Sequence, residues 1–198
     1  MTIPNTSLIR KSALFLVATM LSISSMAADL NQTQRLANQG NVDAQFDLGL
    51  IYAKGEGVRQ DYTKAAEWYT KAARQGGALA QVNLARAYYK GEGVRQDYTK
   101  AAEWYTKAAI QGDALAQVNL GRAYYEGKGV RQDYTKAAEW YTKSANKGDS
   151  IAQFNIGLMY YLGEGMRQDL VIAKEWFGRA CDNGNQKGCD NYRFLNQR

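Results

Sequence analysis

Apolar and polar residues alternate along this chain with the period of an amphipathic α-helix. A first helix is predicted over about 78–89, where one face carries Ala80, Leu84, Ala85 and Tyr88. A second helix is predicted over about 98–110, with a packing face made of Ala101, Trp104, Tyr105, Ala108 and Ala109. Many of these residues are small, which lets neighbouring helices approach closely.

The segment between the two helices has the composition of a turn. The run from Lys90 to Asp97 contains two glycines, which adopt positive φ at low cost, and Asp97 can cap the second helix with its carboxylate. Gly112 is expected to end that helix. Residues four positions apart on the second helix are expected to form ion pairs, namely Glu103 with Lys107, Glu67 with Lys71, Glu139 with Lys143 and Glu175 with Arg179.

This pattern recurs four times with a period of 36 residues and no gaps. The units are 41–76, 77–112, 113–148 and 149–184, and the same run of residues begins at Gly57, Gly93 and Gly129. A period in this range with two helices per unit is typical of an α-solenoid, in which a unit buries its apolar face only against its neighbours. The sequence therefore predicts an all-α stack that forms one domain.

The third unit shows the motif in full, with Ala116, Leu120, Gly121, Tyr124, Gly127, Gly129, Val130, Asp133, Ala137, Trp140, Tyr141, Lys143, Ala145 and Gly148. This motif strongly resembles the SEL-1-like repeat, a relative of the tetratricopeptide repeat with a longer turn between its helices. The resemblance covers residues 29–198 and implies a right-handed α-solenoid of tandem helix-turn-helix repeats. Residues 28–40 match only a second helix and residues 185–198 only a first helix, so both are expected to cap the stack.

Residues 1–27 have the features of a secretory signal peptide. Arg10 and Lys11 form its positive end, the run from Ala13 to Ile23 is apolar, and small residues precede a cleavage site between Ala27 and Ala28. The alternative is an uncleaved anchor, but the run is shorter than the roughly 20 residues that span a bilayer. We expect a bacterial protein of the periplasm or the outside, without a membrane span once the signal is removed.

The composition excludes much enzyme chemistry. Histidine is absent, which removes Ser-His, Cys-His and histidine–metal mechanisms, and two cysteines are too few for a thiolate zinc site. No cofactor or metal is expected. The formal charge is +6, and without Arg10 and Lys11, which lie in the predicted signal described above, it is +4, a mild excess; export further disfavours nucleic acid as a partner.

Arginines recur at one loop position of every unit, as Arg59, Arg95, Arg131 and Arg167. They could form a basic stripe along one edge of the solenoid. Each lies two residues before an aspartate, however, so local pairing with that aspartate is the expectation.

The two cysteines, Cys181 and Cys189, are expected near each other at the C-terminal end. Two antiparallel helices joined by a short turn bring such positions together, and an oxidising compartment would let them form a disulfide. The alternative is a buried pair of reduced thiols. The spacing also resembles that of the cysteine-rich secreted branch of the family, in which each repeat carries such a pair.

Ser144 and Lys147 match the Ser-x-x-Lys pattern of penicillin-recognising serine enzymes, and some cysteine-rich relatives are described as binding or hydrolysing β-lactams. Ser144 aligns with Ala72 and Ala108 of other units, and neither Lys-Thr-Gly nor Ser-Asp-Asn accompanies it. A helical serine in place of alanine is the favoured interpretation, and a β-lactam-binding or weakly hydrolysing protein is the alternative function.

If the solenoid resembles that of tetratricopeptide proteins, the first helices line its concave side. The repeated asparagines would then hold an extended peptide backbone, as in family members with peptide-binding grooves, and the tyrosines and arginines are residue types favoured at interfaces. The alternative is that these residues only pack between helices. The predicted peptide-binding residues are Phe46, Leu50, Ala53, Val82, Asn83, Arg86, Tyr89, Val118, Asn119, Arg122, Tyr125, Phe154, Asn155, Leu158 and Tyr161.

The expected function is binding rather than catalysis. The chain is predicted to be a monomeric adaptor, scaffold or regulator of an envelope process. Its partner is another protein or a peptide with acidic groups or a C-terminal carboxylate, because Arg86 and Arg122 are cationic.

Overall fold

The computed structural model describes residues 29–197, and every regular element in that range is an α-helix. Residues 29–38 are helical and precede α2 (Val42–Lys54), α3 (Tyr62–Arg74), α4 (Ala78–Lys90), α5 (Tyr98–Ile110), α6 (Ala114–Glu126), α7 (Tyr134–Ala145), α8 (Ser150–Leu162), α9 (Leu170–Asp182) and α10 (Gln186–Asn196). The tandem helix-turn-helix solenoid expected from the repeats is confirmed. The predicted signal peptide and its cleavage site lie outside the described residues.

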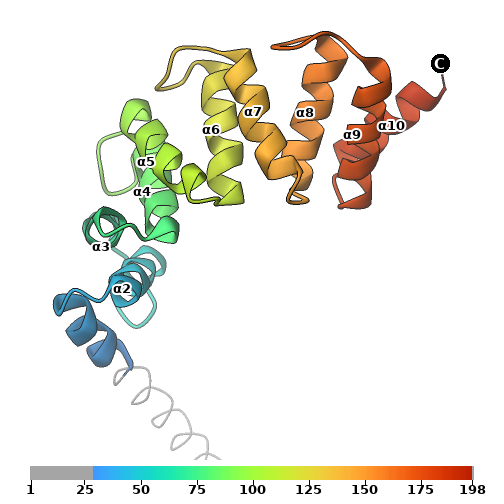
Figure 1. Cartoon of the computed structure of the whole chain (residues 1–198). Coiled ribbons are helices and arrows are strands. Elements are labelled where there is room, and N and C mark those ends of the chain that lie inside the picture. Colours follow the sequence, from blue (N-terminus) through green and yellow to red (C-terminus); the bar gives the residue numbers. More distant parts are fainter. Residues whose placement is uncertain (1–28, 198) are drawn as a thin grey trace, which may run out of the picture.

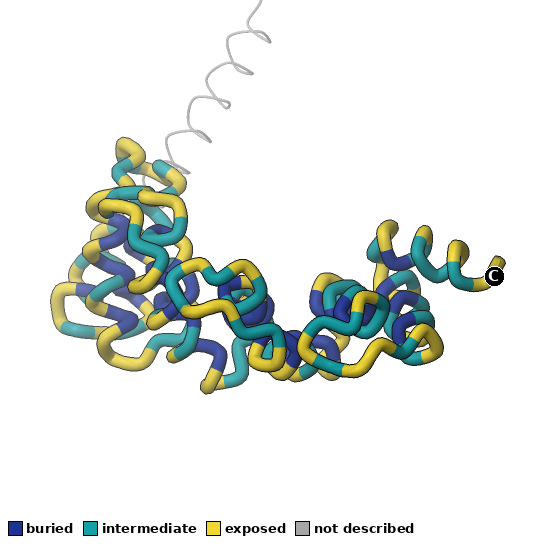
Figure 2. Tube along the Cα trace, turned by 90° about the horizontal axis from the view of Figure 1, so that it is seen from above, coloured by how far each residue is buried: buried dark blue, intermediate teal, exposed yellow. Residues whose placement is uncertain are grey.

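The helices follow one another along a curved path (Figure 1), and each packs against the helices before and after it in the chain. Buried residues accompany this path from one end to the other (Figure 2). The core is therefore a continuous seam between neighbouring helices, as expected where each repeat relies on the next for burial.

The helix ends are capped as the sequence predicts. The carboxylate of Asp97 accepts a hydrogen bond of 3.0 Å from the backbone N–H of Lys100 at the start of α5, and this bond lowers the pKa of Asp97. Gly91 ends α4 with a φ of 76°, in the left-handed region that glycine tolerates best.

The turn of one repeat packs against the preceding repeat. Gly93 has a φ of 72°, and a Cβ placed on it would lie 1.9 Å from the carbonyl oxygen of Tyr62, at the start of α3. Gly129 meets Tyr98 in the same way. Glycine is therefore required here both by backbone conformation and by close approach between repeats.

Aromatic residues of the second helices fill the spaces left by small residues of the first. Tyr141 is buried, and its ring lies against Gly121, where an added Cβ would come within 2.8 Å. Equivalent contacts join Tyr69 to Gly49 and Phe177 to Gly157. Trp104, predicted to pack fully in the core, is only half-buried because its ring lies at the edge of the seam.

The predicted Glu–Lys ion pairs on the second helices are wrong. Lys107 instead places its ammonium 4.0 Å from the centre of the Trp104 ring, three positions earlier on α5, and Lys71 lies 3.5 Å from the Trp68 ring. Lys143 and Arg179 make the same contact in the later repeats. A half-buried indole face beside the helix attracts the cation more effectively than a solvated carboxylate.

Buried glutamines connect successive repeats, a feature that the sequence analysis missed. Gln81 donates through Nε2 to the carbonyl oxygen of Ala73, and its Oε1 accepts a 2.8 Å bond from Gln111. The same arrangement joins Gln45 to Gln75, and Gln153 to Asn183. The signal that could have revealed it is the recurrence of Gln at the first position in all four repeats, with Gln or Asn at the second position in three of them.

The third repeat breaks this arrangement. Lys147 stands where the others have Gln or Asn, and its ammonium donates to the carbonyl oxygen of Gly112. Within residues 29–197, the buried Oε1 atom of Gln117 is left without a hydrogen-bond partner. Such an orphaned acceptor costs stability.

Candidate functional site

The exposed side of the first helices carries a surface whose residues repeat along the stack. We call it the first-helix surface, and it consists of Leu79, Asn83 and Arg86 on α4, Leu115, Asn119 and Arg122 on α6, and Ile151, Asn155 and Leu158 on α8. These positions are spaced by four and then three residues, so they lie on one helical face. Six of the nine belong to the set predicted from the sequence.

The missed members are the three aliphatic residues at the start of each helix. Leu79, Leu115 and Ile151 are 58%, 52% and 53% exposed, although leucine and isoleucine normally seek burial. Their spacing of 36 residues shows that the exposure recurs from repeat to repeat. An apolar row therefore runs beside the asparagines.

The asparagines hold the arginines in place. Arg86 donates through a guanidinium nitrogen to Oδ1 of Asn83 over 2.8 Å, and Asn83 donates through Nδ2 to the carbonyl oxygen of Leu79. Arg122 and Asn119 form the same bond over 2.8 Å. The asparagine oxygens are thus used to orient two exposed cations, which reduces the side-chain entropy lost when an anion binds.

The predicted tyrosines contribute to the surface from its edge. The guanidinium of Arg122 lies 5.1 Å from the centre of the Tyr89 ring, one repeat earlier, and Tyr89 packs edge-on against Tyr98. Tyr125 packs against Tyr134, and its hydroxyl donates a 2.7 Å bond to a carboxylate oxygen of Glu164. That bond is the main reason why the pKa of Tyr125 rises to about 12.

Other predicted residues lie beneath the surface. Val82 and Val118 are buried, Phe46 packs against Tyr69, and Phe154 packs against Phe177. These four side chains support the surface from below, and the residues beside them on the same helices provide its exposed side chains. Leu50, Ala53 and Tyr161 are half-buried at the two ends.

The surface ends in a cavity between the starts of α8 and α10. It has a volume of about 510 Å³, and its lining includes Ile151, Phe154, Asn155 and Lys187. Asn155 makes no side-chain hydrogen bond within the described residues, and Leu158, which replaces the arginine of the earlier repeats, leaves its Oδ1 without that donor. The cavity thus offers apolar walls, a free amide and a cation.

The Ser-x-x-Lys match does not form an accessible nucleophile. Ser144 is fully buried, and its hydroxyl donates to the carbonyl oxygen of Ala114 over 3.1 Å. Lys147 is bonded to Gly112 instead of facing Ser144. Ser144 is therefore a helical residue that ties two repeats together.

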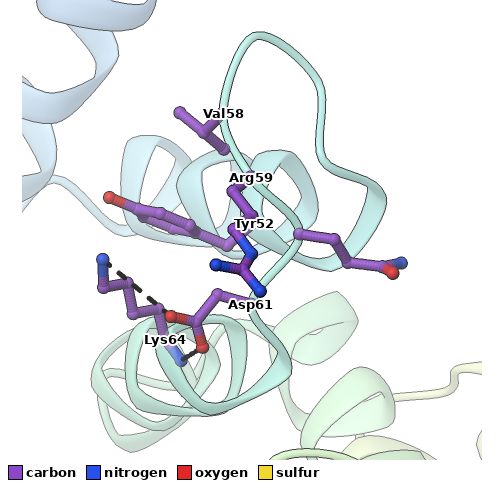
Figure 3. Close-up of a pocket in the computed structure, with 6 residues that line it drawn as sticks. Tyr52, Val58, Arg59, Asp61 and Lys64 are labelled. Carbon is purple, nitrogen blue, oxygen red and sulfur yellow. Dashed lines mark hydrogen bonds and ion pairs between the residues drawn. The ribbon is translucent and has the colours of Figure 1, made fainter.

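The turns between the helices form cavities that the sequence analysis did not predict. One, of about 450 Å³, is lined by Tyr52, Val58, Arg59, Gln60, Asp61 and Lys64 (Figure 3). The expected pairing of Arg59 with Asp61 is wrong, because Asp61 pairs with Lys64 over 3.9 Å. Lys64 lies in the first turn of α3, close to the Asp61 side chain that caps this helix. Arg59 precedes the helix and forms no ion pair within the described residues.

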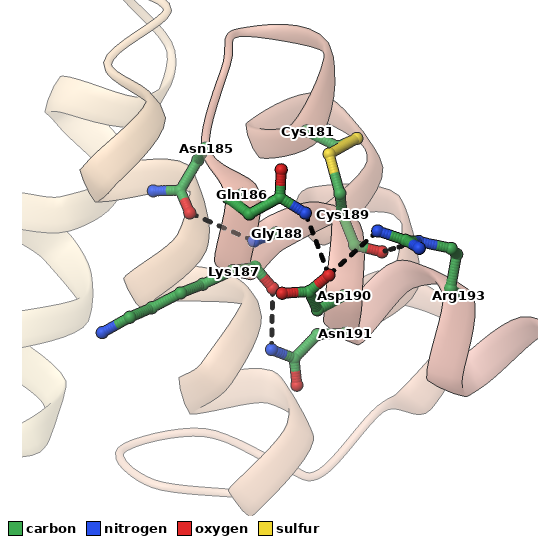
Figure 4. Close-up of a disulfide and its surroundings, with 9 residues drawn as sticks. All are labelled: Cys181, Asn185, Gln186, Lys187, Gly188, Cys189, Asp190, Asn191 and Arg193. Atoms are coloured by element: carbon green, nitrogen blue, oxygen red, sulfur yellow. Dashed lines mark hydrogen bonds and ion pairs between the residues drawn. A yellow bond between two sulfur atoms is a disulfide. The ribbon is translucent and has the colours of Figure 1, made fainter.

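The C-terminal cap is closed covalently. Cys181 at the end of α9 and Cys189 in α10 are joined by a disulfide, with Cα atoms 4.5 Å apart (Figure 4). Asn185 caps α10 between them by accepting from the N–H of Gly188. Gly188 is buried against Ala180, which lets the two helices approach closely.

Among residues 29–197, no cluster of three or more cysteine, aspartate or glutamate side chains could hold a metal ion. No helix in the same range is long and apolar enough to span a bilayer.

Residues 42–77, 78–113, 114–149 and 150–185 each match the Sel1 repeat family, which accounts for most of the chain. The chain belongs to the Sel1 repeat family. The matches start one residue after the units proposed from the period. None of the curated proteins compared with the chain matches it.

Solved structures of Sel1 repeat proteins share the fold. The chain is 38% identical to c5321, a protective antigen of uropathogenic Escherichia coli with an SLR fold, with a TM-score of 0.82 over 84% of this chain and 36% of that one. It is 34% identical to a Sel1 repeat protein of Oxalobacter formigenes, with a TM-score of 0.74 over 80% and 63%. Helicobacter pylori cysteine rich protein B is 27% identical, with a TM-score of 0.51 over 69% and 98%. The Sel1 chain thus spans about a third of the first relative and less than two thirds of the second.

Proposed function

We propose that this chain is an exported Sel1 repeat adaptor or regulator that holds an acidic, extended peptide segment of another protein on its first-helix surface. Sel1 repeat proteins generally mediate protein–protein interactions. The observation that carries the finer proposal is the pair of oriented, exposed arginines, Arg86 and Arg122, set beside exposed aliphatic side chains.

Charge and shape complementarity support an acidic peptide. A guanidinium binds carboxylates through two parallel hydrogen bonds, and each arginine keeps donors beyond the one used on its asparagine. The aliphatic row of Leu79, Leu115 and Ile151 provides apolar contact along the same line. A peptide that alternates acidic and apolar residues would satisfy both.

The two ends of the surface differ and would set the direction of the peptide. On α2, the positions equivalent to Leu79 and Asn83 are Asp43 and Asp47, and the pKa of Asp47 is raised by burial and by the charge of Asp43. On α8 the surface is apolar and ends at the cavity beside Phe154. We therefore expect basic peptide residues toward α2 and an apolar side chain, or a C-terminal carboxylate near Lys187, toward α8.

Export is part of the same proposal. The disulfide between Cys181 and Cys189 is compatible with an oxidising compartment. Mass spectrometry of the protein from periplasmic and extracellular fractions should find Ala28 at the N-terminus and a mass two hydrogens below the reduced form. A cytoplasmic protein that retains Met1 and both thiols would contradict export without affecting the binding surface.

Site-specific photo-crosslinking in cells tests the binding surface. A photoreactive residue at Leu115 should capture a discrete partner, whereas the same residue at Ile110, 72% exposed at the end of a second helix, should not. The captured segment should then be synthesised as a peptide and titrated against the purified chain.

The double variant Arg86→Ala with Arg122→Ala should bind that peptide about tenfold more weakly, because two charge-assisted contacts are lost. Added salt should weaken the wild-type complex. Lys100→Glu, on a second helix, is the matched charge control and should change affinity little. Loss of binding in Lys100→Glu, with normal binding by the double variant, would reject the assignment of the surface.

A further inference from the structure

The cavities at the turns recur with the repeats and lie away from the first-helix surface. The second copy has a volume of about 530 Å³ and is lined by Tyr88, Val94, Arg95, Gln96, Asp97 and Lys100. Each lining residue is 36 positions after its counterpart in the first copy. Tyr88 follows Arg86 by two positions and so projects from the opposite side of α4.

Each cavity contains two cationic side chains: an arginine that forms no ion pair within the described residues, and a lysine that is paired with the aspartate. Arg95 is exposed and makes no ion pair within the described residues, whereas Lys100 lies 3.5 Å from Asp97 and 5.3 Å from the centre of the Tyr88 ring. Figure 3 shows the same arrangement in the first copy, where the side chains of Tyr52, Arg59, Asp61 and Lys64 surround one space.

Gln96 braces the arginine-bearing segment. Its Nε2 donates to the carbonyl oxygen of Tyr89 over 2.9 Å and to the hydroxyl of Tyr98 over 3.0 Å. The turn is therefore held in one conformation. A ligand would find the backbone that carries Arg95 already ordered, so the ordering cost of binding is confined to the arginine side chain.

The third repeat has the same residues at the positions that line these cavities, whereas the fourth repeat lacks the lysine. Lys136 lies 5.4 Å from the centre of the Tyr124 ring and 3.7 Å from Asp133, and Arg131 occupies the position of Arg95. In the fourth repeat Ile172 replaces the lysine, although Arg167 remains. Equivalent turns are one repeat apart, which is two steps from helix to neighbouring helix. With about 8–10 Å between neighbouring helix axes, equivalent turns are roughly 16–20 Å apart.

We infer that the row of three equivalent turns, the first two of which enclose the cavities described above, binds an acidic polysaccharide, with one carboxylate-bearing sugar at each turn. Arg59, Arg95 and Arg131 would bind the carboxylates as planar forks, the geometry that guanidinium groups match best. The hydroxyl oxygens of the tyrosines and the carboxylate oxygens of the aspartates would accept hydrogen bonds from the sugar hydroxyls.

The carboxylates in the cavities decide between classes of polyanion. Asp61 and Asp97 would face the closely spaced phosphates of polyphosphate or nucleic acid, and like charges at short distance repel. A polysaccharide carries its negative charge more sparsely and is rich in hydroxyl donors. Without Arg10 and Lys11 of the predicted signal, 23 Lys and Arg stand against 19 Asp and Glu, and this mild positive charge of +4 would help such a polymer approach.

Alginate, a chain of uronate sugars, is the probe for this inference. Fluorescein-labelled alginate should bind the disulfide-bonded wild-type chain at low salt, and neutral dextran should not. A uronate disaccharide, which cannot bridge two cavities, should bind at least about tenfold more weakly than the polymer, because the linked contacts are lost.

Variants assign the binding to the cavities. Arg59→Ala, Arg95→Ala and Arg131→Ala combined should weaken alginate binding about tenfold or more, with unchanged helical circular dichroism. Arg167→Ala removes the same charge where the lysine is missing and should weaken binding by less than about twofold. The double variant Arg86→Ala with Arg122→Ala should bind alginate normally, which separates this site from the peptide surface.

Three results would overturn the inference: no alginate binding, equal binding by the triple variant, or equally tight binding of polyglutamate or polyphosphate. The last result would show an unselective polyanion surface or a site for acidic proteins.

Discussion

The guanidinium of Arg122 lies 5.1 Å from the centre of the Tyr89 ring, and this contact joins two successive repeats. Arg86 occupies the equivalent place one repeat earlier, where the position that corresponds to Tyr89 is Ala53. Both arginines are bonded to an asparagine on their own helix, but only Arg122 lies over an aromatic ring within the described residues. The side chain of Arg122 is therefore held by one more contact than the side chain of Arg86.

Arg122→Ala should lower the free energy of unfolding by about 0.5–1 kcal/mol through loss of the cation–π contact. Arg86→Ala should change it by less than about 0.5 kcal/mol, as for an ordinary surface residue. Urea denaturation measures both. In a Tyr89→Leu background the cost of Arg122→Ala should shrink to that of Arg86→Ala, and a cost that stays unchanged would show that the ring contributes nothing.

Gly93→Ala should destabilise the stack more than Gly57→Ala. Both glycines have a φ of 72°, and alanine pays about 1–2 kcal/mol in this region. A Cβ at Gly93 would also collide with the Tyr62 carbonyl, whereas one at Gly57 meets no described residue within 4 Å. The additional loss should be about 1–3 kcal/mol in chemical denaturation. Equal losses would mean that the turns do not pack on the preceding repeat.

Lys147→Gln should stabilise the chain by about 1 kcal/mol, because a glutamine there can donate to the orphaned Oε1 of Gln117. The reverse substitution, Gln111→Lys, removes the donor to Gln81 and should cost about the same. Thermal unfolding of both variants checks the pair. If Lys147→Gln lowers the melting temperature, the bond of Lys147 to Gly112 outweighs the orphaned oxygen.

Tyr69→Phe should be stabilising by about 1 kcal/mol, because the buried hydroxyl of Tyr69 has no hydrogen-bond partner in the part of the chain that the structure describes. The fourth repeat already has Phe177 in this place. Phe177→Tyr, which buries a new hydroxyl, should be destabilising. A loss of stability in Tyr69→Phe, measured by urea denaturation, would indicate that the hydroxyl is hydrated or bonded in solution.

Stability should fall at alkaline pH. Burial raises the pKa of Tyr69 and of Tyr105 to about 12, and for Tyr105 the charges of Arg122 and Arg86 oppose the rise. The unfolded chain loses these protons near pH 10 while the folded chain keeps them. The contribution is therefore fully present below about pH 10 and is lost progressively as pH rises through 12. Unfolding curves between pH 9 and 12 should show a shallower decline for Tyr69→Phe with Tyr105→Phe than for the wild type.

The sequence by itself determined the repeat, the helices and their ends. Helix spacing follows from local backbone hydrogen bonds, and the caps at Asp97 and Gly91 depend on residues a few positions away. Helix α5 therefore lies where the pattern predicts, and α4 ends one residue later. The proximity of Cys181 and Cys189 is also local, because one short turn joins their helices.

Only the tertiary structure decided which partner each polar or charged side chain takes. Lys107 contacts Trp104 instead of Glu103, and Asp61 pairs with Lys64, so that Arg59 has no ion pair among residues 29–197. The competing contacts differ by a few tenths of a kcal/mol on a surface, so the neighbouring side chains and their burial decide between them. The buried glutamine bonds and the exposed leucines likewise depend on how one repeat sits against the next, which a period in the sequence does not specify.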